Sequence, residues 1–313
     1  MSKRAAVGKR VEQRDGINPK QPCPCGSGKR YKVCHGAPGG VGDVIVTRPF
    51  AGLAAECELV ALREFVPSAT VELPLGTDRK ITLCTVLPMA AAGIVRGEHE
   101  ALVGMQVQTR SGDISRDLGR AVDWAGTAAS GAALPVADTG GEGKRLQDLL
   151  AADAELVPQM HDDFAWWIPD GEESTPEVAL SLERANAAIM PTARVEAPGV
   201  RAAYWVDAGD KAHLRWVRQE PEEQLLPAMA KLAARGQLTL GEGSRYAGSF
   251  RAHGLLVPVW DLDPESHARE WAEPAEALGA RLADVLSALD AEPLTESERR
   301  SLYGLRGRQV TLR

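Results

Sequence analysis

The chain has 313 residues, of which 44% are hydrophobic and 25% charged, and its formal net charge is −7 at pH 7. These values are typical of a soluble globular protein with enough chain for two packed units. No stretch approaches the roughly 18 consecutive apolar residues of a membrane helix, and the charged first residues lack the apolar core of a secretory signal, so we expect a cytoplasmic protein.

The charge is unevenly distributed along the chain. Residues 1–40 contain nine Lys or Arg against Glu12 and Asp15, a net charge of +7, so the rest of the chain carries −14. A basic segment on an acidic body is typical of an arm that binds anionic surfaces, and equally of a solvated flexible segment.

The N-terminal segment divides into three parts. Residues 1–21 are polar, basic and aperiodic, which predicts a disordered tail. Residues 22–36 hold three of the five cysteines, and residues 37–43 form a Gly/Pro-rich linker. Clustered Cys and His in a cytosolic chain indicate a metal site rather than disulfides.

The body begins near residue 44. Its periodicity predicts a first subdomain over 44–126, with a helix at 49–65, strands at 69–75, 80–87 and 102–109, and a helix at 113–125 capped by Asp113. Residues 127–145 are small, Gly-rich and aperiodic, which predicts a linker or long loop.

Residues 146–313 predict a second subdomain. It comprises strands at 164–168, 201–207, 212–218, 237–240, 246–253 and 255–260, and helices at 176–188, 220–235, 264–289 with a kink or break at Pro274, and 295–303. Thr295 and Glu298 are spaced as a capping box. The fold class is therefore α+β, a mixed body of helices and antiparallel strands. The order helix, strand, strand occurs at 50–87 and again at 222–260, which suggests two similar subdomains.

The cysteine cluster has the spacing C-x-C-x8-C-H, formed by Cys23, Cys25, Cys34 and His35. Three thiolates and one imidazole make a closed tetrahedral zinc site, and a segment this short depends on the metal for its folding energy. The alternative, a reactive or redox thiol group, is disfavoured because all four ligand positions are filled.

The surrounding residues make the pattern specific. The run P-C-P-C-G-S-G-K-R-Y-K-V-C-H-G resembles the SEC-C motif, the zinc-binding tail of the SecA preprotein translocase ATPase, at every fixed position of C-P-C-G-S-G-K-[KR]-Y-K-x-C-[HC]. The resemblance implies that Cys23, Cys25, Cys34 and His35 bind Zn²⁺. It implies no motor, since the chain has no G-x-x-x-x-G-K-[ST]. The body from residue 47 resembles an uncharacterised actinobacterial domain-of-unknown-function family, which implies no activity.

The SEC-C resemblance also implies a docking role. In SecA, the similar module is a docking site for the SecB chaperone, and contacts with the ribosome and phospholipids are also described for it. Carried to this chain, the presenting surface is Lys29, Arg30, Tyr31 and Lys32, although Tyr31 serves equally well as a cover for the zinc site.

We therefore expect an adaptor or interaction protein that docks on the ribosome, nascent chains or protein-export components. One alternative is RNA or DNA binding through the basic N-terminus. A second is an enzyme whose site lies in the C-terminal body.

Other polar residues are interpreted structurally. Cys57 and Cys84 lie in apolar patterns and are expected to be buried hydrophobic residues rather than catalytic thiols. Residues 161–163, His-Asp-Asp, predict a solvated turn. Within residues 261–267, Asp263 is expected to cap a helix rather than to join an acid–base site. The seven Trp are expected in the core first, and in a binding platform second.

Overall fold

The computed structural model describes residues 20–21, 30–33, 45–137, 143–169, 171, 175–291 and 293–308. It confirms the α+β class, with helices and two sheets in the body. In these ranges, no helix has both the length and the apolar character that crossing a bilayer requires.

The first sheet has the strand order β5-β3-β4-β2-β1-β6. Its strands are β1 (Ala69–Glu72), β2 (Lys80–Cys84), β3 (Gly93–Val95), β4 (Glu100–Gly104), β5 (Ala133–Leu134) and β6 (Gln159–Met160). Strands β2 and β4 run parallel, and the other pairs are antiparallel. The helix α2 (Ile114–Thr127) packs on this sheet, and the Asp113 side chain accepts a hydrogen bond from the Arg116 amide, as the cap prediction requires.

The second sheet has the order β10-β11-β9-β8-β7, and its neighbouring strands pair antiparallel. Its strands are β7 (Thr192–Arg194), β8 (Ala203–Asp207), β9 (Ala212–Trp216), β10 (Arg245–Ala252) and β11 (Leu255–Leu262). The helices α4 (Glu222–Ala234), α5 (Ala272–Ser287) and α6 (Glu296–Gly307) bury a second hydrophobic cluster, which includes Trp205, Trp216 and Trp260.

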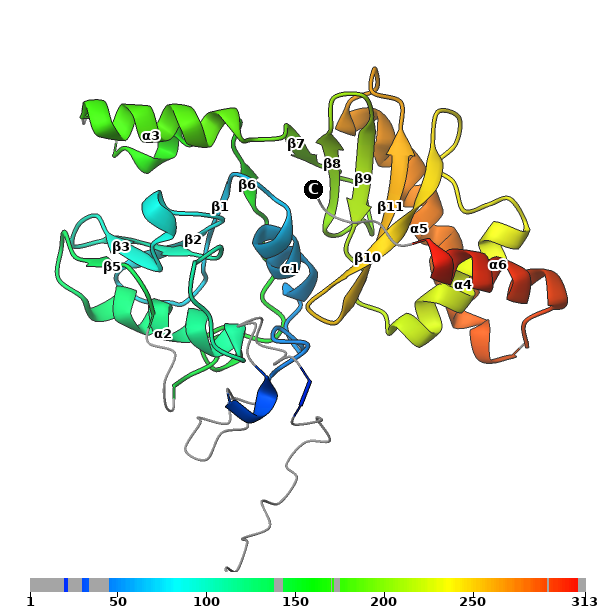
Figure 1. Cartoon of the computed structure of the whole chain (residues 1–313), viewed down its shortest axis with the longest axis horizontal. Helices are drawn as coiled ribbons and strands as arrows, with labels where there is room; N and C mark the ends of the chain where they lie inside the picture. Colours follow the sequence, from blue (N-terminus) through cyan, green and yellow to red (C-terminus); the bar gives the residue numbers. More distant parts are fainter. Residues whose placement is uncertain are drawn as a thin grey trace, which may run out of the picture.

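The helix α1 (Glu56–Glu64) lies between the two sheets (Figure 1). Seven of its nine residues, from Glu56 to Arg63, are buried, as expected for a helix covered on more than one side. One hydrophobic cluster joins α1 to both sheets, because it combines Leu83 and Val103 from the first sheet with Tyr204 and Phe250 from the second. The two halves of the body therefore share a core through α1.

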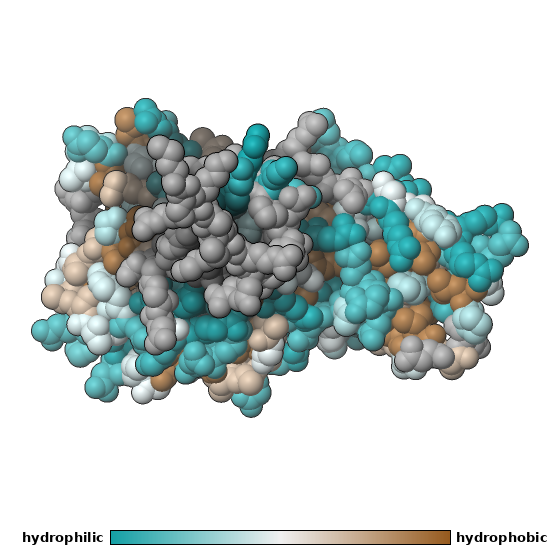
Figure 2. Space-filling model, turned by 60° about the horizontal axis from the view of Figure 1, so that its bottom comes forward, coloured by the Kyte–Doolittle hydropathy of each residue, from teal (hydrophilic) through white to brown (hydrophobic). Residues whose placement is uncertain are grey.

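The helix α3 (Pro176–Ala187) projects from the body (Figure 1). The Thr175 side chain caps it by accepting a hydrogen bond from the Val178 amide, and none of its residues, all within a described range, is buried. On the face shown in Figure 2, the residues drawn in colour are mostly hydrophilic and their apolar groups are scattered in separate patches.

Two of the predicted elements are wrong, and a third, a helix, begins later than predicted. Residues 164–168 form the 3-10 turn η4 (Ala165–Trp167) instead of a strand, because Phe164 stacks on Trp167 with ring centroids 4.5 Å apart. No strand covers residues 237–240, all of which the structure describes. The helix predicted at 264–289 begins only at Ala272, after the turn η5 (Ala268–Trp271), so Pro274 lies in its first turn, where a missing amide hydrogen does not break the helix.

The other predicted helices are present in the predicted order. The helix predicted at 49–65 begins at Glu56, after two turns, and the Thr295–Glu298 capping box is confirmed at α6. Short 3-10 turns occur at η1 (Tyr31–Val33), η2 (Pro88–Ala90), η3 (Leu146–Asp148) and η6 (Leu289–Ala291). The segment 127–145 contains β5, and β6 beyond it pairs with β1, so the first sheet recruits strands from both sides of the predicted linker. The subdomain boundary itself stays a prediction.

Candidate functional site

The predicted zinc ligands Cys23, Cys25, Cys34 and His35 lie outside the described residues, and so does Lys29. Of the other members of the predicted presenting surface, Tyr31 and Lys32 lie in the short turn η1, and Arg30 directly precedes it. Arg30 and Lys32 are exposed, and Tyr31 is half-buried. Within the described ranges, no three His, Cys, Asp or Glu side chains gather as metal ligands.

One backbone contact bears on the zinc prediction. The Tyr31 amide donates to the Gln21 carbonyl at 2.9 Å, and the Val33 amide donates to the Arg30 carbonyl at 3.0 Å. The first bond joins Gln21, which lies just before the predicted ligands Cys23 and Cys25 in sequence, to Tyr31, which lies just before Cys34 and His35. This bond holds Gln21 and Tyr31 next to each other, and a single metal bound by both pairs requires such proximity. Three sulfurs and one imidazole are also the donor set that zinc prefers, so the residues present fit the metal.

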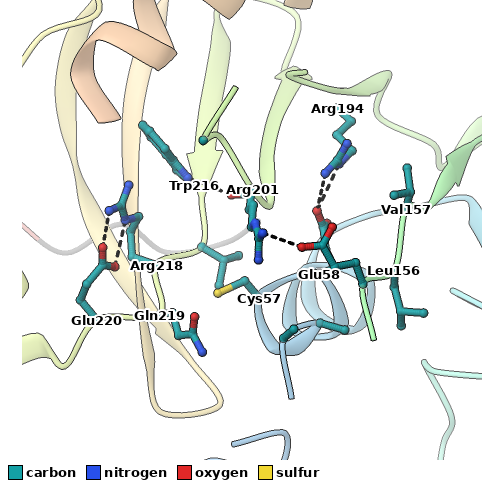
Figure 3. A pocket seen from close by; sticks show the side chains of 15 residues that line it. Cys57, Glu58, Leu156, Val157, Arg194, Arg201, Trp216, Arg218, Gln219 and Glu220 are labelled. Carbon is teal, nitrogen blue, oxygen red and sulfur yellow. Dashed lines mark hydrogen bonds and ion pairs between the residues drawn. The ribbon is translucent and has the colours of Figure 1, made fainter. Parts of the chain in front are cut away.

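A pocket of about 180 Å³ lies where the two halves of the body meet (Figure 3). Its walls come from the start of α1, the segment before β6, and the segments around β7, β8 and β9. Six charged side chains line it, namely Glu58, Glu155, Arg194, Arg201, Arg218 and Glu220. Its lining residues, all of them described, include no Asp or His.

Glu58 anchors the buried wall of this junction pocket. It is 5% exposed, and Arg194 donates to its Oε1 through Nε at 3.1 Å and Nη2 at 2.8 Å. The Ala202 amide donates to the same oxygen at 3.1 Å, and the Tyr204 hydroxyl donates to Oε2. Burial raises the pKa of Tyr204 well above its ordinary value, and the Glu58 charge raises it further, so Tyr204 keeps its proton. Both carboxylate oxygens of Glu58 therefore accept hydrogen bonds, and these bonds stabilise its negative charge in a buried position.

A second ion pair lies on the opposite wall. Arg218 donates to Glu220 through two nitrogens, with Nε 3.0 Å from Oε2, and its guanidinium carbon lies 4.7 Å from the Trp216 ring centroid. Burial by itself would raise the pKa of Glu220, but the hydrogen bond and charge of Arg218 lower it. Arg201 and Glu155 form a third pair, which is exposed, with Nη2 2.5 Å from Oε1.

The two cysteines of the body are free thiols in the described range. Cys84 is buried, as expected, and burial raises its pKa. Cys57 is only partly buried and lines the junction pocket. Burial, followed by the charges of neighbouring glutamates, raises its pKa to about 12, so it is a neutral thiol and a poor nucleophile.

The other polar candidates have structural partners. His161 lies 2.8 Å from the Thr70 hydroxyl, and burial lowers the pKa of its imidazole. The Asp263 side chain accepts from the Glu265 amide at 3.0 Å, which caps a turn rather than a long helix. Asp261 instead accepts from Lys211 and Arg245 at the end of β11.

The junction pocket is the feature that the sequence did not reveal. Its ion pairs join residues up to 136 positions apart, and no local pattern predicts such pairs. The only available signal was Glu58 itself, a carboxylate among the apolar residues of the first predicted helix.

Comparison with family models finds two matches. Residues 49–313 match a family described as "Family of unknown function (DUF5926)", and residues 20–37 match the SEC-C motif. No curated protein and no solved structure matches the chain. Because the first match spans most of the chain, the protein belongs to the family DUF5926, whose function is unknown, and it carries a SEC-C motif ahead of the family domain.

Proposed function

We propose that the protein is a zinc-dependent adaptor whose SEC-C head (residues 20–37) docks on the ribosome and so recruits the α+β body. The observation that carries the proposal is the complete SEC-C pattern, with a donor set that leaves no ligand position open for chemistry. Nascent chains and protein-export components are the other partners consistent with this head.

Zinc would be held by Cys23, Cys25, Cys34 and His35, and its contribution would be to fold the head rather than to activate a substrate. The exposed turn η1 supports a docking role. Arg30 and Lys32 present two positive charges, and the Val33 side chain between them and the second ligand pair is 58% exposed. A basic turn with one apolar side chain suits an anionic surface such as that of the ribosome.

The first test is the zinc content of the purified full-length chain. We expect about one equivalent, and less than about half an equivalent would refute the proposal. Chelation should remove this zinc and leave the unfolding transition of the body unchanged, because the three hydrophobic clusters of the described residues all lie within the family domain. Loss of the body's transition on chelation would show that zinc serves the body instead of the head.

The second test is co-sedimentation with ribosomes. We expect the Cys34→Ser/His35→Ala variant to lose binding, while the Cys57→Ser variant, which removes a cysteine outside the motif, keeps it. The Arg30→Ala/Lys32→Ala variant should bind more weakly and retain its zinc. The matched Lys211→Ala/Arg245→Ala variant removes the same charge from the body and should bind normally.

The alternative of RNA or DNA binding makes a different prediction. The net charge of +7 over residues 1–40 favours electrostatic contact with nucleic acid whether or not zinc is bound. If the zinc-free variant binds RNA as well as the parent chain does, and this binding falls steeply with salt, zinc-dependent docking is wrong.

A further inference from the structure

The junction pocket has a balanced set of charges. Its lining holds three Arg and three Glu, so it carries no net charge, and each Arg is paired with a Glu. A site for a simple anion such as phosphate presents an excess of positive charge, which this pocket lacks. The lining instead offers donors and acceptors of both signs close together, an arrangement that complements a zwitterion.

The three ion pairs differ in how easily a ligand displaces them. The Glu58 carboxylate and the Arg194 side chain are 7% and 15% exposed, and Glu58 has further donors from the backbone and Tyr204. The Arg218 guanidinium is fixed on Trp216 and held by Glu220. These pairs form rigid walls.

The pair Arg201–Glu155 is different because both side chains are more than 60% exposed. An exposed ion pair contributes little to stability, so opening it costs little. Arg201 lies just before β8 of the second sheet, and Glu155 lies before β6 of the first. A ligand that replaces this pair would therefore contact both halves of the body.

The remaining lining and the size of the pocket limit the ligand further. Leu156 and Val157 lie beside Glu155, and the Val157 side chain is 64% exposed. The ring of Trp216 is only 1% exposed and faces Arg218, so it offers no open platform for a sugar or a base. A volume of about 180 Å³ is below the roughly 300–1,000 Å³ of drug-sized sites and suits a molecule of amino-acid size.

We propose that the junction pocket binds a free α-amino acid with an aliphatic side chain. Its carboxylate pairs with Arg201, its ammonium group pairs with Glu155, and its side chain packs against Leu156 and Val157. The ligand thus takes the place of the Arg201–Glu155 ion pair without changing the net charge of the site.

Isothermal titration of the full-length, zinc-loaded protein tests this proposal, with L-leucine as the probe at concentrations up to about 10 mM, a range that covers weak millimolar binding. 4-Methylpentanoate is L-leucine without the ammonium group, and isoamylamine is L-leucine without the carboxylate. We expect L-leucine to bind at least about tenfold more tightly than either, because each lacks one charge-assisted contact.

Variants then locate the site. Arg201→Gln and Glu155→Gln should each weaken L-leucine binding by about 10- to 100-fold. Both residues are exposed, so these variants should keep the melting temperature of the parent chain. Arg245→Gln, which breaks an exposed ion pair on β10, is the matched control and should bind L-leucine normally.

Three outcomes would overturn the proposal. The first is the absence of L-leucine binding in this range. The second is equal binding of 4-methylpentanoate or inorganic phosphate, which would show a simple anion site. The third is L-leucine binding that survives both Arg201→Gln and Glu155→Gln, which would place the ligand elsewhere.

Discussion

Removing Arg194 is expected to destabilise the body strongly, because this side chain holds the buried Glu58 carboxylate between the two halves. In Arg194→Met, Glu58 loses two donors, at 2.8 and 3.1 Å, and keeps the Ala202 amide and the Tyr204 hydroxyl. Each hydrogen bond to a charged group contributes about 1.5–3 kcal/mol, and breaking a fully buried pair costs about 3–5 kcal/mol. Because Arg194 is 15% exposed and two donors remain, we expect a loss of roughly 2–4 kcal/mol in the free energy of unfolding.

The assay is urea denaturation followed by tryptophan fluorescence, with the slope of the transition compared between variants to confirm that the same surface is exposed. Arg245→Met is the control, since Arg245 is 74% exposed in its ion pair and should cost less than about 1 kcal/mol. Tyr204→Phe removes another donor to Glu58, so its effect should not add to that of Arg194→Met, with a coupling of about 0.5–3 kcal/mol. A cost for Arg194→Met equal to that of the control, with additive effects, would refute the reasoning.

Three further predictions concern acid stability, thiol reactivity and a tight turn. The hydrogen bond with His253 lowers the pKa of Glu64 below its ordinary value of 4.5, so the stability that this carboxylate contributes is present above pH 4.5 and is lost as the pH falls through the lower folded-state pKa. The urea midpoint should therefore fall less steeply between about pH 7 and 3 in Glu64→Gln than in the parent chain, and the same pH dependence in both would contradict this. With a pKa of about 12, Cys57 is a thiolate in only about one molecule in 10⁴ at pH 8. Mass spectrometry should therefore show that iodoacetamide modifies Cys57 far more slowly in the native chain than in urea, and equal rates would exclude the raised pKa. Gly254→Ala should lower the urea unfolding midpoint more than Gly209→Ala does. Both glycines have positive φ, but only at residue 254 would the new Cβ lie 3.0 Å from the Thr47 carbonyl oxygen. Equal losses in the two variants would rule out this contact.

Several features followed from the sequence because their causes lie within a few residues. The caps at Asp113 and Thr295 depend on side chains three positions from the amides they bind. The hairpin of β8 and β9 depends on two short strands rich in apolar residues on either side of a short turn. The SEC-C motif is a local pattern in the same sense, since its residue types and their spacing lie within residues 20–37.

The failures of prediction have the opposite cause. Residues 164–168 have the composition of a strand, but the rings of Phe164, Trp166 and Trp167 pack against one another, and Arg96 donates to the carbonyls of Trp166 and Trp167. The hydrogen bonds from Arg96 reach about 70 positions along the chain, so intrinsic strand preference does not decide the structure of this segment.

The sequence by itself determined the α+β class, the zinc-type motif and most helix ends, since periodicity, spacing and capping are encoded over short distances. Only the tertiary structure decided that α1 lies between two sheets and that its Glu58 meets Arg194 from a strand 136 positions away. The junction pocket exists because segments around residues 55, 155, 200 and 218 converge, and no pattern in one chain records such convergence. The physical reason is that packing and ion pairing act through space, while propensity acts along the chain.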